Sequence, residues 1–224
     1  ADEHDVNRAV LEAKEAFIDW KRMPIKERAG YLDALADKLQ ENRDELGLID
    51  CLDSGNTIAG MKGDVDWSAD TWRYFVGLIS EIKGETFSEK PGHLNFTRRE
   101  PYGVVAKINP FNHPLRFCAE KSASALAAGN TVVMKASEQA PLSSLRFAEI
   151  CHEVLPPGVV NVLNGGITCG QAMVRHPDVR RVGVVGSVST GKSIAKDAAE
   201  DLTHVTLELG GKNPVIIFPD VDPK

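Results

Sequence analysis

The chain has 224 residues, of which 42% are hydrophobic and 26% are charged, and its formal net charge is −6. This composition is typical of a globular protein of ordinary size. The mild acidity argues against nucleic acid as a partner, because nucleic-acid-binding proteins usually present a basic stripe. The sequence has no apolar run long enough to cross a bilayer and does not start like a signal peptide, so we expect no membrane partner.

The four cysteines, Cys51, Cys118, Cys151 and Cys169, are scattered along the chain. No pair has the C-x-x-C spacing of a zinc site or a redox pair, so the sequence predicts no metal. We expect all four to act as small hydrophobic side chains in a reducing, cytoplasmic compartment.

Residues 1–82 are expected to form helices. Apolar residues recur at helical spacing over residues 6–20 and again over residues 32–39, and Pro24 separates the two runs. A third helix is predicted over about residues 62–80. We interpret the apolar stripes of these helices as faces packed against a core.

The character of the sequence changes between residues 83 and 100. Two alternating segments, residues 85–88 and 94–97, flank the turn-forming pair Pro91-Gly92. This pattern predicts a β-hairpin that leaves the body of the domain. An isolated two-stranded hairpin is only marginally stable, so we expect a partner surface to cover it.

Residues 101–211 alternate between strands and helices. Strands are predicted at residues 104–108, 131–134, 159–162, 182–185 and 204–208, and helices at residues 114–128, 141–154, 169–175 and 190–199. This alternation predicts an α/β fold with a five-stranded parallel, Rossmann-like sheet and helices on both faces. Ligands of such sheets bind beyond the carboxyl ends of the strands. Residues 215–218 read as one further strand.

Polar clusters follow four of these predicted strands. They are Asn109-Pro110-Phe111-Asn112, Lys135-Ala136-Ser137-Glu138, Gly186-Ser187, and Glu208 before the turn at Gly210-Gly211. A carboxylate held on a glycine turn is suited to act as a general base, although a loop glutamate can also simply bond its own turn. We therefore expect the chemistry at one edge of the sheet.

Residues 186–193 allow a different interpretation. They match the phosphate-loop pattern G-x-x-x-x-G-K-[ST] between a predicted strand and a predicted helix. A P-loop NTPase would use Lys192 at the phosphates and Ser193 at Mg²⁺. This alternative leaves the other polar clusters unexplained. In either case the start of this helix offers free N–H groups to an anion.

Taken together, the clusters resemble the NAD(P)-dependent aldehyde dehydrogenase superfamily. Residues 208–212 look like its glutamate signature, residues 110–114 like its P-[WF]-N-x-P motif, and residues 135–138 like K-P-S-E, with Ala136 in place of proline. The resemblance implies an enzyme that oxidises a small-molecule aldehyde to a carboxylic acid with NAD(P), through a cysteine thiohemiacetal and thioester.

The resemblance also implies roles for individual residues. Glu208 would be the general base, and the side-chain amide of Asn112 would belong to the oxyanion hole. Lys135 and Glu138 would hold the adenosine ribose. A carboxylate there repels a 2′-phosphate, so NAD is expected in preference to NADP. The residues implied in cofactor binding are Ile108, Asn109, Pro110, Phe111, Lys135, Ser137, Glu138, Gly166, Gly170, Gly186, Ser187, Leu209 and Gly210.

The helix after Asn112 lines the aldehyde tunnel in the family. The expected pocket residues here are His113, Arg116, Phe117 and Glu120, with Lys121 as support behind them. Asn112, Arg116 and Glu120 are spaced to share one helix face. This polar stretch suggests a polar or charged aldehyde, and the alternative is an Arg116–Glu120 pair that merely stabilises the helix.

None of the four cysteines occupies the position of the family's nucleophile, which follows the glutamate signature in a separate catalytic domain. The chain therefore resembles the N-terminal half of an aldehyde dehydrogenase. The alternative is a non-catalytic half-protein that binds dinucleotide.

The expected organisation has four parts. Residues 1–82 are helices of the cofactor-binding domain, residues 83–100 an oligomerisation hairpin, residues 101–211 the Rossmann-like core, and residues 212–224 the start of a catalytic domain. The hairpin implies a homodimer or homotetramer.

Overall fold

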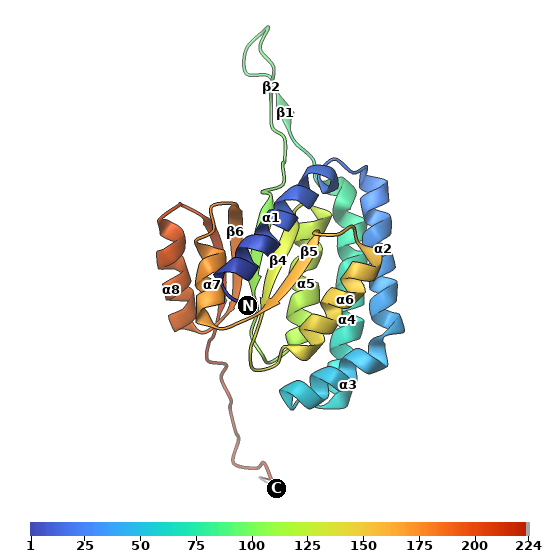
Figure 1. Cartoon of the computed structure of the whole chain (residues 1–224), viewed down its shortest axis with the longest axis vertical. Helices are drawn as coiled ribbons and strands as arrows, with labels where there is room; N and C mark the ends of the chain where they lie inside the picture. Colours follow the sequence, from blue (N-terminus) through green and yellow to red (C-terminus); the bar gives the residue numbers. More distant parts are fainter. Residues whose placement is uncertain (223–224) are drawn as a thin grey trace.

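The computed structural model describes residues 1–222 (Figure 1). Its helices are α1 (Glu3–Trp20), α2 (Ile25–Glu41), α3 (Arg43–Ser54), α4 (Ile58–Leu78), α5 (Pro114–Ala127), α6 (Leu142–Val154), α7 (Ile167–Val174) and α8 (Val188–Ala199), with a short 3₁₀ turn at Ile79–Glu81. Its strands are β1 (Thr86–Phe87), β2 (Asn95–Phe96), β3 (Val104–Ile108), β4 (Thr131–Ala136), β5 (Val160–Asn164), β6 (Val179–Gly186) and β7 (His204–Leu209).

The large sheet has the strand order β5-β4-β3-β6-β7, and all of its strands are parallel. The chain enters this sheet at its central strand, β3, and continues through β4 to β5 at one edge. It then crosses back to β6, on the other side of β3, and ends the sheet with β7 at the opposite edge. The strand order therefore reverses between β3 and β6. In doubly wound sheets this reversal opens a crevice beyond the carboxyl ends of the strands, where dinucleotides bind.

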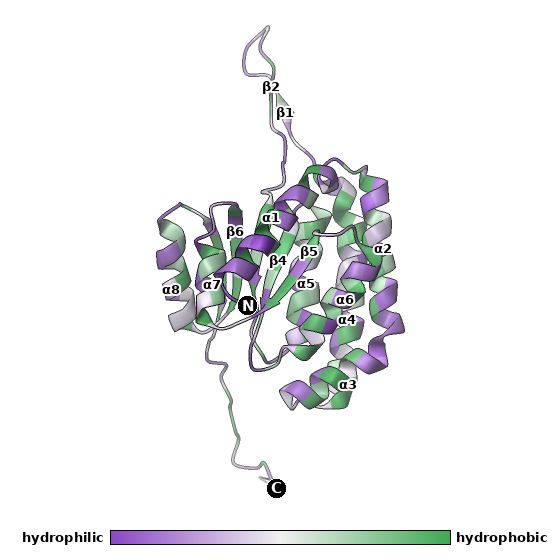
Figure 2. Cartoon of the chain, viewed as in Figure 1, coloured by the Kyte–Doolittle hydropathy of each residue, from purple (hydrophilic) through white to green (hydrophobic). Residues whose placement is uncertain are grey.

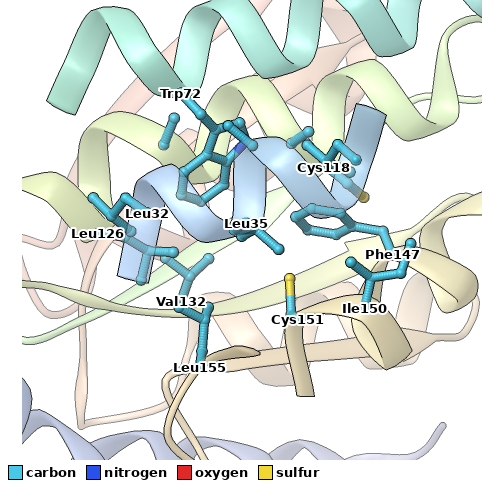
Figure 3. Packing of buried hydrophobic residues seen from close by; sticks show 14 of the residues in the cluster. Leu32, Leu35, Trp72, Cys118, Leu126, Val132, Phe147, Ile150, Cys151 and Leu155 are labelled. Carbon is cyan, nitrogen blue, oxygen red and sulfur yellow. The ribbon is translucent and has the colours of Figure 1, made fainter. Parts of the chain in front are cut away.

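Two apolar cores pack on opposite faces of the sheet. On one face α1, α7 and α8 bury residues against β3 and β6. On the other, α5 and α6 lie on the sheet and α2 and α4 stack behind them, around Trp72, Leu35 and Phe147 (Figure 3). Polar residues gather on the outer faces of α1 and α2 (Figure 2), as expected for amphipathic helices at a domain surface. The predicted parallel sheet with helices on both faces is confirmed.

The predicted hairpin is present as β1 and β2, which pair antiparallel and project away from the body of the chain (Figure 1). Three apolar side chains on it are exposed, namely Phe87 at 54%, Leu94 at 69% and Phe96 at 70%. A two-stranded ribbon that buries none of its large apolar groups has little stability of its own.

The sequence-based prediction for the N-terminal helices was incomplete. It lacked α3, and it started α4 near residue 62 rather than at Ile58. Helix α3 buries only Leu46, Gly47 and Asp50, so its apolar period is weak. Local turn chemistry sets the boundary between the two helices. Gly55 ends α3 with a φ of +79°, and the Thr57 hydroxyl accepts the N–H of Gly60 at the start of α4.

Three further expectations were wrong. Residues 215–218 form no strand, and their side chains are 68–82% exposed. Helix α8 begins at Val188, and strand β6 begins at Val179 rather than near residue 182. Within residues 1–222, none of the helices combines the length and apolar character needed to cross a membrane.

Candidate active site

Parallel pairing brings the predicted polar clusters to one edge of the sheet. Ile108 at the end of β3 pairs with Lys135 of β4 on one side and with Val184 of β6 on the other. Leu209 at the end of β7 pairs with Gly186 at the end of β6. Residues that follow these strands therefore converge, as the sequence predicted.

Asn112 lies in the loop between β3 and α5. Two hydrogen bonds of Asn109 hold the first residue of the loop in place. Its backbone N–H donates to the carbonyl of Lys135 at 3.1 Å, and its side-chain Nδ2 donates to Sγ of Cys118 at 3.2 Å. Helix α5 begins at Pro114, so the prediction that Asn112 shares a helix face with Arg116 and Glu120 was wrong. Within the described chain, the side-chain amide of Asn112 makes no hydrogen bond. It is free to bind a ligand.

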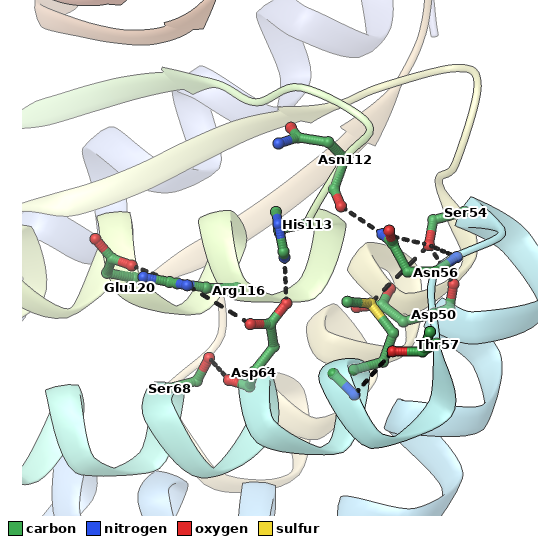
Figure 4. A network of polar contacts seen from close by, with 12 residues as sticks. Asp50, Ser54, Asn56, Thr57, Asp64, Ser68, Asn112, His113, Arg116 and Glu120 are labelled. Carbon is green, nitrogen blue, oxygen red and sulfur yellow. Dashed lines mark hydrogen bonds and ion pairs between the residues drawn. The ribbon is translucent and has the colours of Figure 1, made fainter. Parts of the chain in front are cut away.

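The side chains that follow Asn112 form a charged network with α4 (Figure 4). Nδ1 of His113 lies 2.5 Å from Oδ2 of the buried Asp64. The guanidinium of Arg116 lies 3.6 Å from Oδ1 of Asp64 and 3.1 Å from Oε2 of Glu120, and it stacks 4.8 Å above the ring of Trp67. Arg116 is therefore held on three sides.

Lys121 of α5 reaches Glu208 at the end of β7. Its ammonium nitrogen lies 2.9 and 3.1 Å from the two carboxylate oxygens of Glu208 and 3.0 Å from Oε1 of Glu120. Burial alone would lower the pKa of Lys121, but its hydrogen bonds to Glu208 and Glu120 outweigh burial and raise it. The Glu208 side chain remains 52% exposed, so a substrate or water can reach it.

A cavity of about 430 Å³ lies between the sheet and helices α4 and α5. Its charged lining groups are Lys107, Glu120, Lys121, Arg181 and Glu208, and its aromatic lining groups are Trp67, Tyr74 and Phe75. Burial lowers the pKa of Lys107 to about 8, and the positive charges of Arg181 and Lys121 act in the same direction. Glu208 thus faces a cavity lined by the positively charged side chains of Lys107, Lys121 and Arg181.

The second polar cluster lies after β4. Nζ of Lys135 donates to Oε2 of Glu138 and to the carbonyl of Ala136, both at 3.0 Å. The backbone N–H of Glu138 and the Lys135 ammonium together lower the pKa of Glu138. A lysine and a carboxylate held side by side can donate to and accept from a pair of hydroxyl groups.

Two helices present their N-terminal ends near this cluster. Gly166 precedes α7, and Gly170 within α7 lies beside Lys135 and Ile108, where a methyl group would make ordinary van der Waals contact at 3.6 and 3.9 Å with their side chains. Ser187 caps α8, its hydroxyl accepting the N–H of Thr190 at 3.1 Å. The start of a helix attracts anions such as phosphate, because its N–H groups are free and its dipole end is positive.

The phosphate-loop interpretation of residues 186–193 is wrong. All but the first two of these residues belong to α8, so no extended loop of N–H groups is available to surround a phosphate. Gly191 is explained by packing instead. A side chain there would come within 2.7 Å of Cδ2 of Leu209, so Gly191 lets α8 lie against the end of β7.

The cysteines have structural roles. Cys118, Cys151 and Cys169 are buried, Cys51 is half-buried, and all four are unpaired. Burial raises the pKa of Cys118 to about 11, so its thiol is not activated as a nucleophile. The expectation that they act as small hydrophobic side chains is confirmed for Cys118, Cys151 and Cys169, which belong to the two apolar cores, whereas Cys51 lies outside both.

Sequence reasoning missed five residues at the site: Asn56, Asp64, Trp67, Lys107 and Arg181. Lys107 had a detectable signal, since it is the one charge in an otherwise apolar strand. Asp64 and Trp67 lie among other helical residues of α4, and nothing in the sequence relates them to a loop about fifty residues away.

Comparison with known proteins gives a consistent result. The model of the aldehyde dehydrogenase family matches residues 1–224. Aldehyde dehydrogenase tropH of Talaromyces stipitatus is 46% identical, over 97% of this chain and 43% of its own. Human 4-trimethylaminobutyraldehyde dehydrogenase is 42% identical, over 98% of this chain and 45% of its own.

Solved structures agree. The NAD⁺ complex of an aldehyde dehydrogenase from Bacillus cereus is 41% identical and superposes with a TM-score of 0.93, over 99% of this chain and 46% of that one. The chain thus spans less than half the length of the relatives it matches.

Proposed function

Because the chain belongs to the aldehyde dehydrogenase family, we propose that it is the cofactor-binding part of an enzyme that oxidises an aldehyde to a carboxylic acid with NAD. The nucleophilic cysteine would come from the part of the relatives' length that this chain does not span. The chain itself would supply the oxyanion donor, the general base and the cofactor site.

The residues at the sheet edge fit a dinucleotide. Lys135 and Glu138 would hold the ribose hydroxyls, and Ser187 at the start of α8 would hold the pyrophosphate. Gly170 is a proposed cofactor contact because it lies within van der Waals reach of Ile108 and Lys135. The other proposed cofactor contacts are Asn109, Pro110, Phe111, Ser137, Gly166, Gly186, Leu209 and Gly210. NAD supplies the oxidising power of the reaction.

Two groups of this chain would act on the substrate. The Asn112 amide would donate a hydrogen bond to the aldehyde oxygen as negative charge develops on it. The Glu208 carboxylate would accept a proton from the attacking thiol or water.

The observation that carries the proposal is the Lys121–Glu208 pair. It joins α5, which starts beside the free Asn112 amide, to the last strand of the sheet, so the proposed base and the proposed oxyanion donor lie at one edge of the sheet.

The direct test is NADH formation by the whole protein with a panel of aldehydes. Asn112→Ala should lower kcat by about 100- to 1,000-fold, the usual cost of one oxyanion donor. Gln139→Ala, on the exposed surface beside the cofactor cluster, is a control that should change kcat little. Absence of aldehyde-dependent NADH from the whole protein would contradict the proposal.

The substrate is proposed to be a polar or charged aldehyde. The residues that we propose for the pocket contributed by this chain are His113, Arg116, Phe117 and Glu120, and three of these side chains are ionisable. Of the four, Glu120 also lines the cavity of about 430 Å³. Arg116→Leu should therefore lower kcat/KM for charged aldehydes relative to aliphatic ones. An unchanged ratio would leave Arg116 as a helix-stabilising residue only.

A homodimer or homotetramer is also proposed, formed through the hairpin of residues 83–100. The exposed Phe87, Leu94 and Phe96 support it, because they need a covering surface. Phe96→Glu should give a smaller assembly by light scattering, whereas Glu89→Gln at the exposed hairpin tip should not. The free cysteines support a cytoplasmic location.

A further inference from the structure

The loop that holds Asn112 is tied to the helical layer at two consecutive residues (Figure 4). The backbone carbonyl of Asn112 accepts Nδ2–H of Asn56 at 2.7 Å. The next side chain, His113, approaches Oδ2 of Asp64 at 2.5 Å through Nδ1. A carboxylate has no proton to donate, so His113 is the donor and Asp64 the acceptor. The peptide that joins Asn112 to His113 is therefore held from both sides.

Both anchors are themselves fixed. Asp64 is only 7% exposed, lies in the second turn of α4, and also pairs with Arg116. Asn56 donates a second bond to Oγ of Ser54, and that hydroxyl in turn donates to the carbonyl of Asp50. The loop is thus attached to helix α4 and to the turn between α3 and α4, in addition to its own strand.

The Asn112 side chain has no such support of its own. Its amide makes no hydrogen bond within residues 1–222, and Figure 4 shows it turned away from the charged network. No side chain of the loop caps α5 either. The direction of the amide therefore depends on the backbone at residues 112 and 113.

We propose that the Asp64–His113 hydrogen bond aims the Asn112 amide at the developing oxyanion, which makes His113 a positioning residue of the reaction. This inference rests on the proposed function. An oxyanion donor contributes only when it is held in place before charge develops, and a displacement of about 1 Å can cost about 100-fold in rate.

This role differs from the direct contact with the aldehyde that a place in the substrate pocket would give His113. If His113 touched the substrate, its replacement would change KM and the order of preferred aldehydes. If His113 acts through Asn112, its replacement lowers kcat, leaves KM nearly constant, and has no effect once the Asn112 amide is gone. The two roles therefore predict different results in a double-mutant cycle.

The experiment uses the whole enzyme and four variants: His113→Phe, His113→Asn, Asn112→Ala and the double variant His113→Phe/Asn112→Ala. Phenylalanine keeps an aromatic ring beside Phe117, whose ring centroid lies 6.2 Å from that of His113, but it removes the hydrogen bond. Asparagine offers an N–H donor close to the position of Nδ1. Thermal unfolding and NAD affinity are measured for each variant as a check on folding.

We expect His113→Phe to lower kcat by about 10- to 100-fold, a part of the full cost of the donor. His113→Asn should recover most of that loss. In the Asn112→Ala background the Phe substitution should change kcat less than about twofold, because there is no amide left to position.

Three outcomes would overturn the inference. They are an unchanged kcat in His113→Phe, an equal loss with and without Asn112, and a loss confined to KM. Each of these requires that the unaltered enzyme forms NADH from an aldehyde. If it forms none, the proposed function itself fails, and Asn112 has no oxyanion to bind.

Discussion

Lys121 and Glu208 are 87 residues apart in the sequence, yet Nζ of Lys121 lies 2.9 and 3.1 Å from the two carboxylate oxygens of Glu208. The pair connects the middle of α5 to the end of β7. It keeps the glutamate in one place while leaving it half-exposed. A general base needs this combination, because it must be both positioned and reachable.

Glu208→Gln should lower kcat of the whole enzyme by about 100- to 10,000-fold, the usual contribution of a general base. Glutamine keeps the shape of the side chain and removes its basicity. Steady-state kinetics with a fixed aldehyde gives the value. Glu120→Gln is the matched control, because Glu120 also bonds Lys121, at 3.0 Å, but is not the proposed base. Similar losses in kcat for both variants would argue that the charge around Lys121 matters rather than proton transfer.

Glu138→Gln should raise the use of NADP relative to NAD. The Glu138 carboxylate is bound to Lys135 and its pKa is lowered, so it is ionised at neutral pH and repels a 2′-phosphate. Removal of that charge should raise the ratio of kcat/KM for NADP to that for NAD by about tenfold, which corresponds to about 1.4 kcal/mol. Glu149→Gln, on the exposed side of α6, should leave the ratio unchanged.

Lys107→Met should stabilise the protein at neutral pH and not at high pH. Burial lowers the pKa of Lys107 from 10.5 to about 8. The unfolded chain therefore binds more protons between these two values, and the free energy of unfolding of the parent protein rises with pH across that window. Below pH 8 the buried charge costs at most about 3 kcal/mol. Urea unfolding at pH 7 and above pH 10 measures the difference, and an equal gain at both pH values would contradict this account.

Asp50→Asn should stabilise the protein above pH 6 and have little effect near pH 4. Burial raises the pKa of Asp50 to about 6, although the nearby Ser143 hydroxyl and Leu115 N–H oppose that effect. Neither carboxylate oxygen makes a hydrogen bond of good geometry. The unfolded chain loses this proton first, so the free energy of unfolding falls between pH 3.8 and 6 and is then constant.

The expected gain from Asp50→Asn is at most about 3 kcal/mol. Unfolding curves of the variant and the parent at pH 4 and pH 7.5 provide the comparison. Asp70→Asn, whose side chain is 81% exposed, is the control. A destabilised variant at pH 7.5 would show that the charge of Asp50 is needed at the start of α5.

The Rossmann-like part of the fold was predictable because each element has a strong local signal. The mostly apolar run Val104–Ile108 and the glycine after α5 mark their elements without help from the rest of the chain. Helix α3 was not predictable, since its buried face includes Gly47 and Asp50. A glycine is needed at position 47 because Lys62 of α4 packs against it, and this contact exists only in the folded structure.

The candidate site shows the same division. Asn112 and Glu208 lie in short sequence patterns that resemble a family, so they could be proposed as site residues from the sequence. Asp64 and Lys107 acquire their roles from residues that are close only in the folded structure. The sequence periodicity of α4 identifies Asp64 only as a polar residue of a helix. Whether a carboxylate is buried depends on the helix that covers it, which a local pattern does not encode.

Helix α5 begins two residues after Asn112 and carries Lys121 two turns further along. A helix rises about 1.5 Å per residue and resists compression along its axis. It therefore fixes the distance between Asn112, the proposed donor to the oxyanion, and Lys121, which holds the proposed base Glu208. A substitution that tilted α5 would displace both of its ends. The proposed functions of Asn112 and Glu208 should then be lost together rather than one at a time.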